Sequence, residues 1–155
     1  MKLTDALLGE HAVLYELFEH VRHAAAGGNG GDIRQAILVL DRLLVSHARV
    51  EEDLLFPALD PHIGQMGPLA VMRAEHRGIE YLLAAAQREP DPAALGRIVA
   101  DLLDLAQGHF QKEEMALFPM ARRFLDEVTL TRLGDGWATR RKVNIHAQGC
   151  HLGAA

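Results

Sequence analysis

One eleven-residue pattern occurs twice in the chain and restricts its fold more than any other feature. Residues 47–57 read HARVEEDLLFP and residues 109–119 read HFQKEEMALFP. Both copies place two adjacent glutamates four and five residues after a histidine and end in Leu-Phe-Pro. Because an α-helix turns by about 100° per residue, residues four apart share a face. Each copy therefore predicts a helix that presents its histidine and its first glutamate on one side.

The apolar positions around the two copies keep a helical period over four long segments. We expect Thr4 or Asp5 to cap the first helix and Asp32 to cap the second. Pro57 should kink or end the second helix because it lacks a backbone donor, and Pro119 has the same place in the fourth. The predicted helices cover about residues 4–26, 32–57, 68–88 and 93–118, with a shorter fifth at 125–141.

The predicted fold is all-α. Short connections, such as the glycine-rich residues 27–31, make successive helices antiparallel. The duplicated helix pairs therefore predict an up-down-up-down four-helix bundle with a short C-terminal fifth helix. We assign residues 1–143 to this one domain and residues 144–155 to a flexible tail without apolar period. Trp137, on the fifth helix, either covers one end of the bundle or forms a homodimer contact.

Composition excludes several classes of function. The 155 residues suit one domain, and a net charge of −5 without clustered Lys or Arg argues against a nucleic-acid partner. A single cysteine rules out an internal disulfide framework. The chain has no run of 18 apolar residues and no signal-peptide core at its start. We therefore expect a cytoplasmic protein with no membrane-spanning segment.

The apolar residues around each copy indicate which helix face is buried. Those predicted to lie on the face of His47 or of His109 are Leu40, Leu43, Leu44, Leu54, Leu102, Leu105 and Ala106. Both histidines, and the glutamates four residues after them, are thus predicted to point into the core. The first and third helices add His11 and His76, which also have apolar residues on their faces.

These inward polar side chains need a compensating charge. A lone histidine on an apolar face is more often a hydrogen-bonded core residue than a ligand. Two carboxylates buried among leucines, however, are strongly destabilising unless a cation compensates them, and no lysine or arginine occupies a matching core position. A pair of divalent metal ions would supply the charge, with two histidines for each ion and Glu51 and Glu113 as bridges. The mixed nitrogen and oxygen set suits iron, manganese or zinc.

The order H…HxxxE…H…HxxxE, with Leu-Phe-Pro after each HxxxE, resembles the hemerythrin-like family, also called the HHE cation-binding domain. The resemblance covers about residues 5–125. It implies a four-helix bundle with a non-haem di-iron centre that Glu51 and Glu113 bridge. The terminal ligands that it implies are His11, His47, His76 and His109.

One position departs from the family pattern. Oxygen-carrying hemerythrins have a second histidine one turn after the third-helix histidine, and this chain has Glu80 there. Glu80 could be a seventh ligand, an acceptor for an imidazole N–H, or a polar residue near the mouth of the site. The change puts reversible oxygen carriage in doubt, because a carboxylate makes iron easier to oxidise and a missing ligand opens it to water.

Three functions remain open at this point. The resemblance implies a module that binds or senses O₂ or NO, with an apolar shell that keeps water out: Phe18, Leu44, Leu83 and Leu105. The alternative is a redox or iron-handling enzyme that reduces nitric oxide, removes peroxide, or repairs iron–sulfur clusters. In a third reading the metal only stabilises the fold. Whether the protein is an enzyme, and which redox or signalling partner it has, stays undecided by the sequence.

Other side chains have simpler predicted roles. The acids beside the predicted ligands are expected to make surface ion pairs of little energetic value: Glu10, Glu52, Glu75 and Glu114. Glu10 and Glu75 could also brace neighbouring backbone. Tyr15 could form a hydrogen bond to an oxygen ligand held by the metal. The favoured interpretation is that Tyr15 is a core aromatic residue whose hydroxyl reaches solvent. Cys150, with His146 and His151, could bind a metal, but an accidental cluster in a flexible tail is favoured. Core filling is predicted for Met66, Met72, Met115 and Met120.

Overall fold

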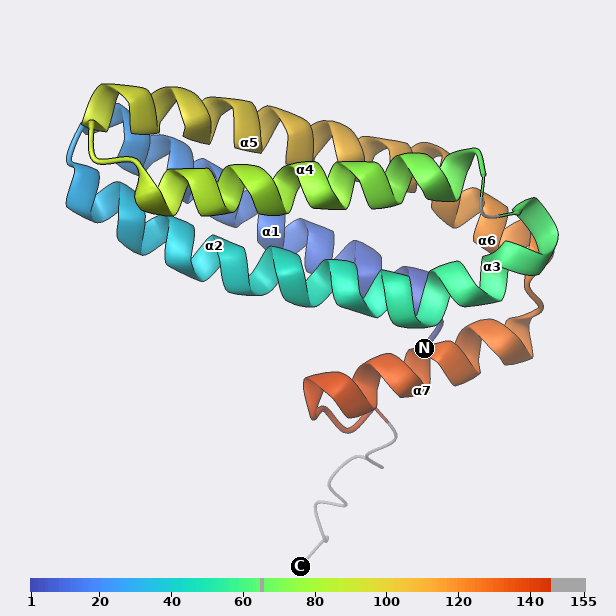
Figure 1. Ribbon diagram of the computed structural model, residues 1–155. Coiled ribbons are helices and arrows are strands. Elements are labelled where there is room, and N and C mark those ends of the chain that lie inside the picture. Colours follow the sequence, from blue (N-terminus) through green and yellow to red (C-terminus); the bar gives the residue numbers. More distant parts are fainter. Residues whose placement is uncertain (65, 146–155) are drawn as a thin grey trace, which may run out of the picture.

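The computed structural model describes residues 1–64 and 66–145, so Cys150, His146 and His151 lie outside the described residues. The long helices of the chain lie side by side, each antiparallel to the one before it (Figure 1). They are α1 (Leu3–Ala26), α2 (Gly30–Val50), α4 (Pro68–Arg88) and α5 (Pro92–Lys112). No strand occurs in the described part of the chain, and the predicted all-α bundle is confirmed.

Both repeated segments depart from regular α-helix at the same place. α2 continues into the π-helical turn η1 (Glu51–Leu55), and α5 continues into η2 (Glu113–Leu117). The backbone N–H of Phe56 donates to the Glu51 carbonyl, and that of Phe118 donates to the Glu113 carbonyl. The wider turn precedes the proline, which lacks a donor, and the chain continues as α3 (Phe56–Ile63) or α6 (Phe118–Phe124). Pro57 thus does not end the helix.

Two predicted helix caps are wrong. α1 follows Lys2, which makes no side-chain cap, and Thr4 is fully buried inside the helix instead of capping it. α2 begins at Gly30 because Asn29 accepts a hydrogen bond from the Gly31 N–H at 3.0 Å, so Asp32 already lies in the first turn. The other predicted starts agree better, since α4 begins at Pro68 as expected.

The apolar core has two parts. One lies among α1, α2, α4 and α5, and it contains the predicted shell residues Phe18, Leu44 and Leu83, with Leu105 packed against it. The other is built largely by the first residues of α1, η1, α3, α6 and the C-terminal helix. Some core predictions are wrong: Leu43, Met66 and Met115 are exposed, while Met72 is buried. Met115 lies within η2, where the π-helical turn changes the face on which each residue lies.

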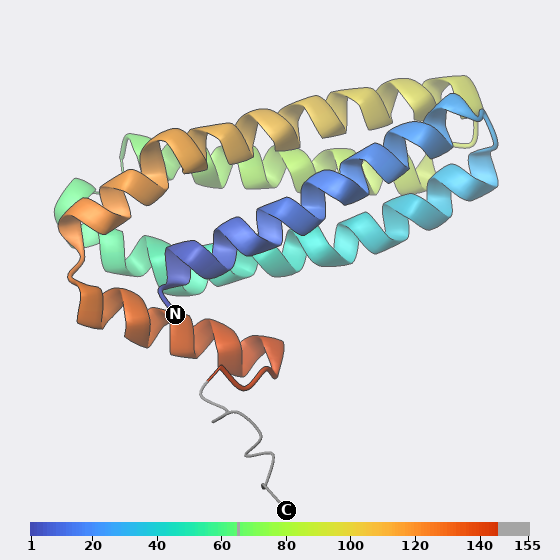
Figure 2. The same cartoon turned by 180° about the vertical axis from the view of Figure 1, so that it is seen from behind.

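The fifth helix, α7 (Glu127–Arg141), is confirmed and packs against α1 outside the bundle, as Figure 2 shows from behind. Asp126 caps it by accepting a hydrogen bond from the Thr129 N–H at 2.7 Å. Gly134 permits the close approach, because a Cβ there would collide with the Met1 carbonyl. Trp137 packs against the second part of the core, in agreement with the predicted covering role.

None of the helices in residues 1–64 and 66–145 combines the length and the apolar character that crossing a lipid bilayer requires.

Candidate metal centre

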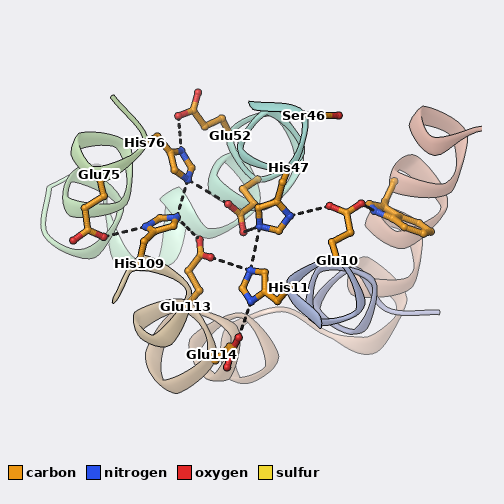
Figure 3. A network of polar contacts seen from close by, with 12 residues as sticks. Glu10, His11, Ser46, His47, Glu52, Glu75, His76, His109, Glu113 and Glu114 are labelled. Carbon is orange, nitrogen blue, oxygen red and sulfur yellow. Dashed lines mark hydrogen bonds and ion pairs between the residues drawn. The ribbon is translucent and has the colours of Figure 1, made fainter. Parts of the chain in front are cut away.

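Four buried imidazoles, one from each long helix, meet between the two parts of the core (Figure 3). The Nε2 atoms of His11 and His47 are 3.1 Å apart, and those of His76 and His109 are 3.0 Å apart. The local reason is the helical spacing: each histidine has a buried apolar residue one turn before it. The four rings therefore form two pairs, with α1 and α2 supplying one and α4 and α5 the other.

Glu51 and Glu113 are fully buried, and each lies between the two pairs of rings. Glu51 places Oε1 at 3.5 Å from His47 Nε2 and Oε2 at 3.3 Å from His76 Nε2. Glu113 places Oε1 and Oε2 each at 3.2 Å from one Nε2, on His109 and His11 respectively. None of the four carboxylate oxygens receives a well-directed hydrogen bond. We call these two residues the central glutamates.

The ligand-type atoms form two groups, in each of which they lie within 4.8 Å of one another. The His11 group contains His11, His47 and both central glutamates, and the His76 group contains His76, His109 and the same glutamates. Six of the seven predicted ligands thus come together. Glu80 belongs to neither group in the described residues; its side chain is exposed, and its role as a ligand stays a prediction.

Each of the four rings is held on its outer side by a different glutamate. Nδ1 of His47 pairs with Glu10 at 2.8 Å, and Nδ1 of His109 pairs with Glu75 at 3.0 Å. The remaining Nδ1 contacts, both 2.8 Å, join His11 to Glu114 and His76 to Glu52. The prediction that Glu10, Glu52, Glu75 and Glu114, here called the outer acids, make only surface ion pairs is therefore wrong.

The outer acids follow the internal repeat. Glu10 and Glu75, which precede a ligand histidine, hold the ring from the other helix of the same half. Glu52 and Glu114, which follow a central glutamate, hold a ring from the opposite half. The signal in the sequence was an acid directly beside a core-facing residue on each of the four helices. Angles counted on one helix missed it because these acids contact neighbouring helices.

The donor set fits divalent cations. An imidazole that donates its Nδ1–H to a carboxylate turns the lone pair of Nε2 toward the centre, which is the arrangement that metal-binding histidines adopt. Four such lone pairs and two carboxylates without hydrogen bonds converge here. In the described part of the chain, no lysine or arginine forms an ion pair with Glu51 or Glu113. Positive charge is therefore what this buried cluster lacks.

The pKa shifts of the rings have the same cause. Burial alone lowers the pKa of His76, but Glu51 and Glu52 raise it to about 9. Burial opposes the same change at His47 and His109, whose pKa values the nearby glutamates also raise. Burial and the charge of Glu113 raise the pKa of Glu51. The carboxylates thus favour positive charge at the centre of the bundle.

Some of the outer acids have further partners besides the rings. Burial alone would raise the pKa of Glu10, but hydrogen bonds from His47, Arg141 and Trp137 lower it to about 2. Tyr15 gives its hydroxyl hydrogen to Glu114 at 3.1 Å, a partner that the prediction did not foresee. Burial and Glu114 raise the pKa of Tyr15 to about 12, so this hydroxyl stays a donor.

The two halves differ beside the rings. Phe110, which follows His109, stacks on His11 with ring centroids 3.9 Å apart. The repeat places Ala48 at the corresponding position after His47. Ala48 lines a small cavity of about 10 Å³ with His76 and Glu80, among other residues, which is room for about one water molecule. The small side chain thus leaves space beside His76 that the aromatic ring fills beside His11.

Comparison with known proteins agrees with this geometry. The family model described as the hemerythrin HHE cation-binding domain matches residues 2–121. Searches of curated proteins and of solved structures gave no significant match. The matched range contains α1 to η2 with all four histidines, both central glutamates and all four outer acids. The chain therefore belongs to the hemerythrin HHE cation-binding domain family.

Proposed function

We propose that the protein binds or senses O₂ or NO at a dinuclear iron centre. Its ligands would be His11 and His47 for one ion, His76 and His109 for the other, and both central glutamates for each. The observation that carries the proposal is the sharing of Glu51 and Glu113 between two ligand groups, with their oxygens otherwise without hydrogen bonds. Manganese or zinc could occupy the same donor set.

The residues of the chain would have separate tasks at such a centre. The outer acids fix the orientation of each imidazole through Nδ1 and leave Nε2 free for binding. The aromatic and aliphatic side chains around the rings exclude bulk water. When bound in the reduced state, the iron pair would supply the electrons and the open coordination position that O₂ or NO requires.

The small cavity supports a small ligand over a large one. It adjoins three of the ligand rings, those of His47, His76 and His109, and apolar side chains also line it. At about 10 Å³ it offers space for about one water-sized molecule and none for an organic substrate. Glu80 lines the same cavity and is exposed, so we propose that it lies at the entrance.

The test is anaerobic reconstitution with ferrous iron, followed by metal analysis and absorbance spectra before and after exposure to O₂ or NO. We expect two iron ions per chain and a charge-transfer band that depends on the gas. The double variant Glu51→Gln with Glu113→Gln should retain little iron, while Glu16→Gln, at an exposed position of α1, should match the wild type.

Three results would count against the proposal in different ways. Wild-type protein that retains no iron, or a double variant with unchanged iron content, would reject the metal centre itself. Iron-loaded protein that changes its spectrum with neither gas would reject ligand binding and favour a metal that only stabilises the fold. Catalytic turnover of NO or peroxide with a reductant would replace the sensing function by an enzymatic one.

A further inference from the structure

The C-terminal helix reaches the metal centre through one outer acid. Trp137 Nε1 donates to Glu10 Oε1 at 2.6 Å, and Arg141 donates to Oε1 at 2.5 Å and to Oε2 at 2.9 Å. The same Oε2 pairs with His47 Nδ1 at 2.8 Å. Figure 3 shows Glu10 between His47 and the ribbon of this helix. Three donors from α7 thus converge on the carboxylate that orients one ligand ring.

Arg141 also holds the backbone beside that ring. Its Nη1 donates to Ser46 Oγ at 2.6 Å, and its Nη2 lies 3.3 Å from the Ser46 carbonyl oxygen. Ser46 directly precedes His47 in α2. The guanidinium therefore fixes both the acid that orients the imidazole and the residue next to the one that carries it.

The other three outer acids have partners from within the bundle. Lys112 of α5 pairs with Glu75, and Tyr15 of α1 donates to Glu114. Glu52 is 42% exposed, and its side chain pairs with His76 Nδ1. Within residues 1–64 and 66–145, α7 makes no hydrogen bond or ion pair with these three acids. Among the outer acids in the described residues, α7 therefore makes polar contacts only with Glu10, which holds the ring of His47.

We propose that Trp137 and Arg141 are positioning residues through which α7 controls how firmly the His11 group holds its metal ion. The inference rests on the proposed metal centre and deepens it, because it makes the two ions unequal. A carboxylate fixed by three donors cannot turn away from His47, so the ring is held ready for binding before an ion arrives. The helix lies beyond residues 2–121, the range that the family model matches.

The variants that isolate this contact are Trp137→Phe, Arg141→Gln and their combination. Trp137→Phe removes the N–H and keeps an aromatic ring. Arg140→Gln is the matched control, because Arg140 is the neighbouring arginine of α7 and contacts Asp53 and the Arg49 carbonyl instead of Glu10. Circular dichroism and thermal unfolding of the metal-free proteins show whether each variant keeps its fold. If the combined variant unfolds, the single changes and Arg141→Lys, which keeps the charge but loses the planar fork, replace it.

Each iron-loaded protein is mixed anaerobically with an excess of a ferrous chelator, and iron release is followed by absorbance. Changes to the hydrogen-bond partner of a ligand typically alter metal affinity 10–100-fold, and these residues act one contact further out, so we expect roughly tenfold faster release. The acceleration should affect one ion per chain and leave the other at the wild-type rate. Unchanged rates, equal acceleration of both ions, or the same effect in Arg140→Gln would overturn the proposal.

A second measurement uses the metal-free protein and separates this inference from the proposed function. Nitrogen NMR of the histidine rings should show a shifted signal for His47 in the combined variant, with His109 unshifted and Arg140→Gln like the wild type. A His47 signal that does not move would overturn the positioning role, whether or not iron binds. Wild-type protein that retains no iron would reject the metal centre, and the ring signals would still decide the role of α7.

Discussion

The half made by α1, α2 and η1 contributes the same polar residues as the half made by α4, α5 and η2, but different neighbours surround them. Each half supplies two histidines, one central glutamate and two outer acids, and each central glutamate contacts rings of both halves. The cluster is therefore incomplete in either half alone. This dependence gives a physical reason for the repetition of the pattern, since each buried group needs partners from the other copy.

The neighbours of the rings differ because those positions carry no such requirement. Beside His11 stand Phe110 and Tyr15, which fill the space with aromatic rings. The equivalent positions beside His76 are Ala48 and Glu80, which line a cavity. The ligands must therefore match between the two halves, whereas a cavity that admits a small molecule is needed beside only one pair of rings.

The largest expected effect tests the sharing of the central glutamates. Because Glu51 contacts His47 and His76, Glu51→Gln alone should lower the affinity for both iron ions. The decrease should be at least the 10–100-fold that loss of an outer hydrogen-bond partner causes. Equilibrium dialysis with ferrous iron, with Glu16→Gln as control, measures it. If one ion kept its wild-type affinity, the two halves would be separate sites and the comparison would fail.

Phe110 fills the space beside His11. This fully buried ring stacks on His11, so Phe110→Ala should destabilise the metal-free protein by about 3–5 kcal/mol in urea unfolding. Phe124→Ala is a suitable control, because Phe124 is exposed at the end of α6 and should cost much less. A loss for Phe110→Ala no larger than that of the control would mean that the ring does not close this half.

Ala48 lines the cavity beside His76. Ala48→Phe would fill the cavity beside His76, so we expect slower reaction with O₂ or NO and overpacking of about 1–3 kcal/mol. Stopped-flow absorbance of iron-loaded protein measures the first effect and urea unfolding the second. Ala12→Phe, at an exposed position of α1, should change neither greatly. An unaltered gas reaction in Ala48→Phe would show that the ligand enters elsewhere.

The smallest expected effect separates Tyr15 from Glu80, which follow their histidines by the same spacing. Tyr15→Phe removes one hydrogen bond to the half-buried Glu114 and should cost roughly 1 kcal/mol in urea unfolding. Glu80→Gln changes an exposed group and should leave stability within about 0.5 kcal/mol. Iron analysis of Glu80→Gln adds a second answer, because a marked loss of iron would make Glu80 a ligand after all.

Much of the fold could be predicted because helices and their order are encoded locally. Periodicity and the Gly and Pro breaks located the four long helices and the shorter α7, and the start of α4 at Pro68 was predicted. The π-helical turns were not predicted, because the widening at Glu51 and Glu113 depends on the proline that follows and on packing. The exposed Leu43 shows the same limit, since angles on one helix do not show which of its residues a neighbouring helix covers.

The sequence by itself determined the inner polar set, because spacing on one helix places His47 with Glu51, and His109 with Glu113, on a buried face. Only the tertiary structure decided which outer acid holds which ring, that α7 reaches Glu10, and that Ala48 leaves a cavity beside His76. The physical reason is range. The first set follows from the turn of a single helix, whereas the second depends on contacts between side chains that packing alone brings together.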